Sequence, residues 1–80
     1  MVLFLFSQVE VIMNNLIDRL EQEKVEYVVK QAAIEDALEE NPEISSRQRM
    51  LLNVQLHSLL TLITVLEARI TDLREINNYK

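Results

Sequence analysis

The sequence predicts an all-α protein, an antiparallel two-helix hairpin that resembles a coiled coil and assembles into a homo-oligomeric helical bundle. Three observations predict this fold class. The 80-residue chain is 49% hydrophobic and has no glycine, a composition typical of long helices with little loop. Its one proline, Pro42, divides it into two long segments. Each segment carries apolar residues at helical spacing.

Residues 1–12 form an apolar N-terminal extension ahead of a helical hairpin that spans residues 13–80. The opening MVLFLF lacks the basic segment of a secretory signal and is followed by no small-residue cleavage site. A bilayer span needs about 20 apolar residues, and Gln8 and Glu10 come too early for one. Met13 would also make an ordinary start. We therefore expect a soluble, cytoplasmic protein.

The first helix is predicted over about residues 8–40. Ser7 and Glu10 fit a capping box, in which each side chain binds a free backbone N–H at the helix start. Apolar residues then recur mostly in steps of three, four or seven, at Ile12, Leu16, Leu20, Tyr27, Ile34 and Leu38. A second apolar set makes the stripe wider than one partner helix covers; it comprises Val25, Val28, Val29, Ala32 and Ala33.

A turn is predicted over residues 41–45. Pro42 lacks an N–H and disfavours helical geometry at Asn41, so the first helix ends there. Ser45 and Gln48 fit a second capping box. Because the connection is short, the two helices should run antiparallel.

The second helix, about residues 46–77, carries an unbroken heptad seam of the kind that packs knobs into holes. Its members are Leu52, Leu56, Leu59, Ile63, Leu66, Ile70 and Leu73. A further row lies beside it: Leu51, Val54, Leu62 and Val65. Two helices cannot cover this much apolar surface, so we expect a homo-oligomer with the seven seam residues in its interface.

Charge is divided unevenly along the chain. Residues 1–44 carry ten acidic and three basic side chains, and residues 45–80 carry three acidic and five basic ones. The two halves should therefore attract each other. The acidic total argues against a DNA- or RNA-binding protein, which needs a basic surface.

The sequence carries no pattern typical of an enzyme, a metal site or a cofactor site. It has no cysteine, and His57, the one histidine, has no carboxylate at helical spacing. The Glu-x-x-His motif of di-metal bundles is absent. Acidic pairs such as Glu35 and Glu39 are typical of a solvated helix face. We expect a protein that is not an enzyme.

The stretch EISSRQRM at the start of the second helix is the candidate ligand site. A helix start favours anions, and Ser45, Arg47 and Arg49 add hydroxyl and guanidinium donors that suit phosphate. Alternatively, Ser45 only caps the helix, Arg47 faces water and Arg49 pairs with Glu43 or another acidic residue. In an oligomer the cluster could meet Tyr27, Lys30 and Gln55 and so form a polar pocket between helices.

Residues Leu16 to Ile70 resemble a family of small phage-encoded helical hairpins, known mainly from crAss-like and Gram-positive phages. The resemblance rests on LIDRLEQEKVEYVVKQAAIEDALEE and ISSRQRMLLNVQLHSLLTLITVLEARI. The family pattern commonly has methionine and tyrosine where this chain has Leu59 and Leu62. The chain is also similar to phage sponge proteins, which sequester cyclic nucleotide signals made by bacterial immune systems.

The resemblance implies a non-enzymatic anti-defence protein in the cytoplasm of a bacterial host. It would bind a cyclic nucleotide between protomers, with the arginines clamping phosphate and Tyr27 stacking on a base. An alternative is a helical interaction protein that inhibits or scaffolds a host or phage protein. Membrane-surface binding through Phe4 and Phe6 is a third, but that face lacks basic residues, and we expect no membrane partner.

Overall fold

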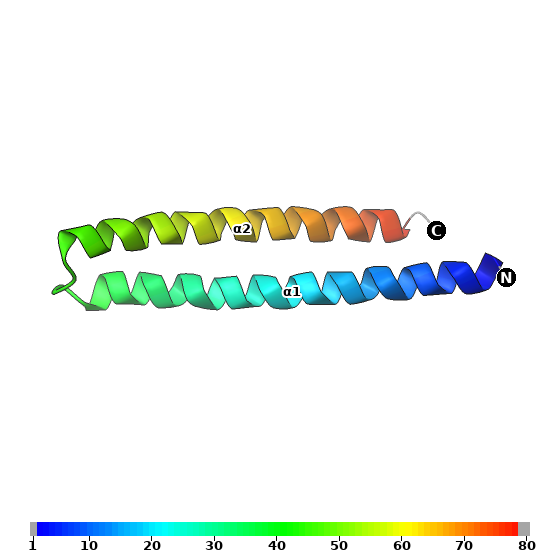
Figure 1. Cartoon of the computed structure of the whole chain (residues 1–80), viewed down its shortest axis with the longest axis horizontal. Helices are drawn as coiled ribbons and strands as arrows, with labels where there is room; N and C mark the ends of the chain where they lie inside the picture. The colour runs from blue at the N-terminus through cyan, green and yellow to red at the C-terminus, as the bar shows by residue number, and fades with distance from the viewer. Residues whose placement is uncertain (1, 79–80) are drawn as a thin grey trace.

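The computed structural model describes the backbone of residues 2–78 and the side chains of residues 8–76. Within this part the chain forms two helices, α1 (Val2–Glu40) and α2 (Ser46–Asn78), and no strand. The helices run antiparallel along a rod of 64 × 14 × 14 Å (Figure 1). The all-helical hairpin predicted from the sequence is confirmed.

The start of α1 differs from the prediction. The helix begins at Val2 rather than at Gln8, so Ser7 is an internal residue of α1 and the proposed Ser7–Glu10 capping box is wrong. No glycine or proline precedes Pro42, and a capping preference does not stop a helix that can continue. From Val2 on, the apolar extension therefore continues the helix of the hairpin.

The turn between the helices is closed by backbone and side-chain hydrogen bonds. The Ile44 N–H donates to the carbonyl of Asn41 at 3.3 Å, just beyond the end of α1. The Ser45 hydroxyl accepts a hydrogen bond from the Gln48 N–H at 3.1 Å, as predicted for the cap of α2. These contacts reverse the chain within a few residues and set the two helices side by side.

The core is a single seam between α1 and α2. One end of it is a cluster of Ile17, Leu20, Leu66 and Ile70, each at most 7% exposed. Leu16, Tyr27 and Leu73 pack against this cluster, and Ile34, Leu59 and Ile63 are buried as well. Burial of such side chains contributes about 1.5–3 kcal/mol each, so this seam is the main source of stability within one chain.

The structure places the predicted heptad seam of α2 against α1 of the same chain. Four of its members are buried and three are half-buried; in chain order the seven are Leu52, Leu56, Leu59, Ile63, Leu66, Ile70 and Leu73. Their packing partner in the hairpin is therefore α1. A role for them between copies of the chain stays a prediction.

The facing seam of α1 is polar in its middle. Between the buried Leu20 and Ile34, the half-buried positions that continue the seam spacing are Lys24, Tyr27 and Gln31. The aliphatic seam of α2 thus meets an amphipathic stretch of α1, where side chains keep polar tips near water.

Much apolar surface stays outside the seam. Among the described residues the exposed large hydrophobic side chains are Val9, Val11, Ile12, Val25, Val28, Val29, Met50, Leu51, Val54, Leu60, Leu62, Val65 and Ile76. Such extended apolar surface is typical of proteins that bind a partner.

Candidate functional site

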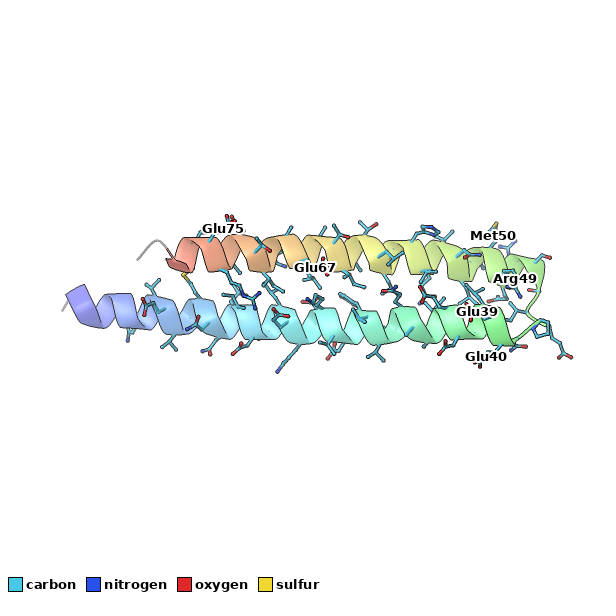
Figure 2. All side chains as sticks on the ribbon, turned by 180° about the vertical axis from the view of Figure 1, so that it is seen from behind. Glu39, Glu40, Arg49, Met50, Glu67 and Glu75 are labelled. Atoms are coloured by element: carbon cyan, nitrogen blue, oxygen red, sulfur yellow. The ribbon has the colours of Figure 1, made fainter. Side chains whose placement is uncertain are left out.

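Arg49 binds the end of α1. Its guanidinium donates hydrogen bonds to the carbonyl oxygens of Leu38, at 2.9 Å, and Asn41, at 3.4 Å. Figure 2 shows Arg49 at the turn end of the hairpin. The last carbonyls of a helix lack partners within the helix and carry partial negative charge, so a cation there is favourable. Arg49 therefore holds the turn together, and its interaction is with carbonyls rather than with Glu43.

Ser45 and Arg47 have different surroundings. The Ser45 hydroxyl is used in the cap of α2. Arg47 is exposed and forms no ion pair or side-chain hydrogen bond with the described part of the chain. Of the two arginines in EISSRQRM, Arg47 is thus the one whose guanidinium the described part of the hairpin leaves available.

Tyr27 and Lys30 lie together on α1. The Lys30 Nζ is 5.7 Å from the centroid of the Tyr27 ring, which is within cation–π range. The Tyr27 hydroxyl donates to Glu23 Oε1 at 3.1 Å. This hydrogen bond, together with the charge of Glu23, raises the pKa of Tyr27 above its ordinary value. The site offers an aromatic face, an ammonium group and a neutral phenol.

The predicted ligand residues do not converge within one chain. About 12 Å of helix axis separates Lys30 from Leu38, the residue that Arg49 binds. Gln55 is exposed on α2. A cyclic nucleotide that touched both the turn and the Tyr27–Lys30 pair would need groups from more than one chain.

The side of α2 turned away from α1 carries a feature that the sequence reasoning missed. From Met50 to Leu66 the chain has no Asp, Glu, Lys or Arg. This uncharged run could have indicated the feature from the sequence alone. Five polar side chains here bond to a carbonyl four residues earlier, at 2.7–3.0 Å: Asn53, His57, Ser58, Thr61 and Thr64. We call the exposed surface of residues 50–66 the outer face of α2.

The outer face is nearly flat. It carries a shallow hollow, open to solvent and lined by Met50, Asn53, Val54, His57, Ser58 and Thr61. A second open hollow on α1 is lined by Glu21, Gln22, Val25 and Glu26. Each hollow is lined by one helix, so a ligand in either would stay largely in water.

Two further features bear on function. The segment Ser46–Ile76 is long and apolar enough to cross a membrane, judged by length and composition alone. The side chains of Phe4 and Phe6, named above for membrane binding, lie outside the described residues.

No group of three potential metal ligands occurs among the residues that the structure describes. The His57 Nδ1 lies 2.7 Å from the Asn53 carbonyl oxygen of its own helix.

These observations define a class of protein, a slender helical hairpin with surface features suited to binding. The chain belongs to the Sequestin family, whose sequence model matches residues 14–72. The match includes the turn and most of both helices, and it leaves residues 1–13 and 73–80 outside. The family name indicates a sequestering role. No curated protein and no solved structure matches the chain.

Proposed function

We propose that the protein is a non-enzymatic phage anti-defence protein that sequesters a cyclic nucleotide immune signal in a pocket between protomers. The observation that carries this proposal is the Sequestin match, joined to the shape of the hairpin. The rod is 14 Å across in both short directions, and its seam is filled with side chains. A nucleotide therefore needs a second copy of the chain to enclose it.

The Tyr27–Lys30 pair supplies the chemistry for this ligand. An aromatic ring stacks on any base, and an ammonium group binds phosphate as a point charge. In the free chain Lys30 covers the Tyr27 ring. A base that takes its place over the ring frees the Lys30 Nζ to reach a phosphate of the same ligand. Gln55, exposed on α2, has an amide for the base edge.

Capture without turnover needs little else. Affinity requires a rigid cavity that excludes water, and two long helices locked by one seam supply rigid walls. Hydrolysis would require an acid, a base or a nucleophile placed at the phosphate. The proposed pocket residues Tyr27, Lys30 and Gln55 supply donors and an aromatic face.

The test is thermal unfolding of the full chain with cyclic mononucleotides, cyclic dinucleotides and ADP-ribose-type cyclic nucleotides, each in excess. A ligand at a hundredfold over its Kd adds about 2.7 kcal/mol to the free energy of unfolding. We expect a shift with one class and its loss in Lys30→Gln. Lys24→Gln is the matched control. It removes the same charge from α1, but the Lys24 Nζ is paired with Glu21 at 3.6 Å and so is not offered to a phosphate. No shift with any class, or equal shifts in both variants, would contradict the proposal.

A second candidate function is the binding of a host or phage protein. It is favoured by a valine patch on α1, Val25, Val28 and Val29, which are 44–63% exposed at helical spacing. An apolar strip of this kind can lie in the groove of a partner protein. This function predicts a complex that survives removal of small molecules and is lost in Val28→Asp. Retention of the complex by that variant would rule out the valine patch.

A further inference from the structure

We propose that the outer face of α2 binds the same face of a second copy, antiparallel, about a two-fold axis at Thr61. The inference stands apart from the proposed function. The outer face is turned away from α1, which carries Tyr27 and Lys30, so this interface does not itself enclose that pair. The observations that carry it are the composition of the outer face, its hydrogen bonds and the order of charges along α2.

The outer face is ready for burial. Six large apolar side chains of this segment are exposed in the single chain: Met50 56%, Leu51 44%, Val54 60%, Leu60 39%, Leu62 44% and Val65 49%. Burial of a polar group is costly unless the group is hydrogen-bonded. Five of the six polar side chains from Asn53 to Thr64 have a backbone partner on α2 itself, and the sixth, Gln55, is exposed. Covering this face therefore leaves few unsatisfied groups.

The charges along α2 select an antiparallel copy. Residues seven apart lie on one side of a helix, and one such row is Arg47, Val54, Thr61, Ala68 and Glu75. All five are exposed, and Figure 2 shows Glu75 on the side of α2 turned away from α1. A two-fold axis at Thr61 places Arg47 opposite the partner's Glu75 and Val54 opposite the partner's Ala68.

This pairing gives Arg47 a partner. Neither Arg47 nor Glu75 forms an ion pair or side-chain hydrogen bond within the described part of the hairpin. In the antiparallel pair the two would form one ion pair at each end of an uncharged centre. Small side chains at Ser58, Thr61 and Ala68 would let the two helices approach closely. A parallel pair would instead place like charges together at both ends.

A lipid bilayer fits the same face less well. The uncharged run from Met50 to Leu66 is about 25 Å long at 1.5 Å per residue, shorter than the hydrocarbon core of about 30 Å. The seam also ties α2 to α1, whose charged residues Glu21, Lys24 and Lys30 lie along the same rod. Inserting α2 would bring these charges with it, at high cost. A second hairpin covers the outer face without that cost.

The test is a charge exchange, read by sedimentation equilibrium of the full chain at low salt. We expect Arg47→Glu or Glu75→Arg to raise the dissociation constant of the copies roughly tenfold or more. The double variant Arg47→Glu/Glu75→Arg should restore it. Gln22→Glu, an exposed change of the same charge on α1, should have little effect. Thr61→Lys places two ammonium groups at the axis and should give monomers with unchanged circular dichroism.

Three results would overturn the inference: a monomeric wild-type protein, single variants that associate like the wild type, or a double variant no better than the singles. Co-sedimentation of the wild type with phosphatidylcholine vesicles, lost in Thr61→Lys, would assign the face to a membrane instead.

The ligand test remains separate. If the charge exchange succeeds and no nucleotide shifts unfolding, the interface stands and the proposed ligand fails. If Lys30→Gln abolishes the binding of a nucleotide, while the Arg47 and Glu75 variants associate like the wild type, the proposed ligand stands and the interface lies elsewhere.

Discussion

Tyr27 combines a core contact with a polar surface. Its ring packs against the buried cluster of Ile17, Leu20, Leu66 and Ile70, and its hydroxyl donates to Glu23. Ionisation of the phenol would place a negative charge beside a carboxylate, so the neutral form is favoured and the pKa rises. Tyr27 is thus held as a neutral donor at any physiological pH.

We predict that Glu23→Gln lowers the pKa of Tyr27 towards its ordinary value of 10.0. Since folding raises this pKa, its contribution to stability is complete below the unfolded value and is lost as the pH rises through the folded value. The measurement is a phenolate absorbance titration in a Tyr79→Phe background, in which Tyr27 is the sole tyrosine. Glu35→Gln is the control. An unchanged titration in Glu23→Gln would mean that the hydrogen bond to Glu23 is not formed in solution.

At the scale of the helices, the turn depends on Arg49. The last carbonyls of α1 have no helical partners, and Arg49 reaches back from α2 to bind two carbonyls at this end of the hairpin. This link joins the end of one helix to the start of the next. It acts beside the Ser45 cap, which satisfies a donor of α2.

We predict that Arg49→Ala lowers the free energy of unfolding by about 1 kcal/mol, the net value of a typical intramolecular hydrogen bond. Arg69→Ala is the matched control, since Arg69 is exposed on the same helix and forms no ion pair or hydrogen bond with the described residues. Urea unfolding at fixed protein concentration measures both. Equal stability of the two variants would show that the Arg49 contacts contribute nothing.

The fold was largely predictable from local signals. Pro42 and Ser45 mark the turn, and the heptad row of α2 marks its packing face. A heptad row does not identify its partner, however, and the structure shows that α1 of the same chain packs against it. The start of α1 was misjudged because Ser7 fits a cap sequence, although nothing before it interrupts a helix.

The candidate site was harder to predict. Helical spacing gives the face on which a side chain lies, but not which acceptor a long side chain will choose. Arg49 was expected to bind a carboxylate or a phosphate, yet it binds the carbonyl of Leu38, which lacks a partner within α1, and the carbonyl of Asn41. Lys30 and Tyr27 are three residues apart on one helix and lie together, a contact that the spacing would have given. Their distance from the turn follows from the rise of about 1.5 Å per residue along α1, so it could have been predicted from the sequence.

At the scale of the whole molecule, the thin rod shape decides how much surface the chain can bury. A rod 64 Å long and 14 Å across has a large surface and one filled seam. Its exposed apolar residues suit a protein that works by binding a partner. Membership of the Sequestin family indicates that the binding serves sequestration.

The most direct test of sequestration is recovery of the ligand. The protein would be incubated with a mixture of cyclic mononucleotides, cyclic dinucleotides and ADP-ribose-type cyclic nucleotides, then filtered, and the free nucleotides quantified before and after heat denaturation. We predict that one class disappears from the filtrate and returns chemically intact when the protein unfolds. Lys30→Gln should leave that class in the filtrate. A nucleotide that returns cleaved would indicate an enzyme, and a filtrate unchanged by the protein would contradict capture.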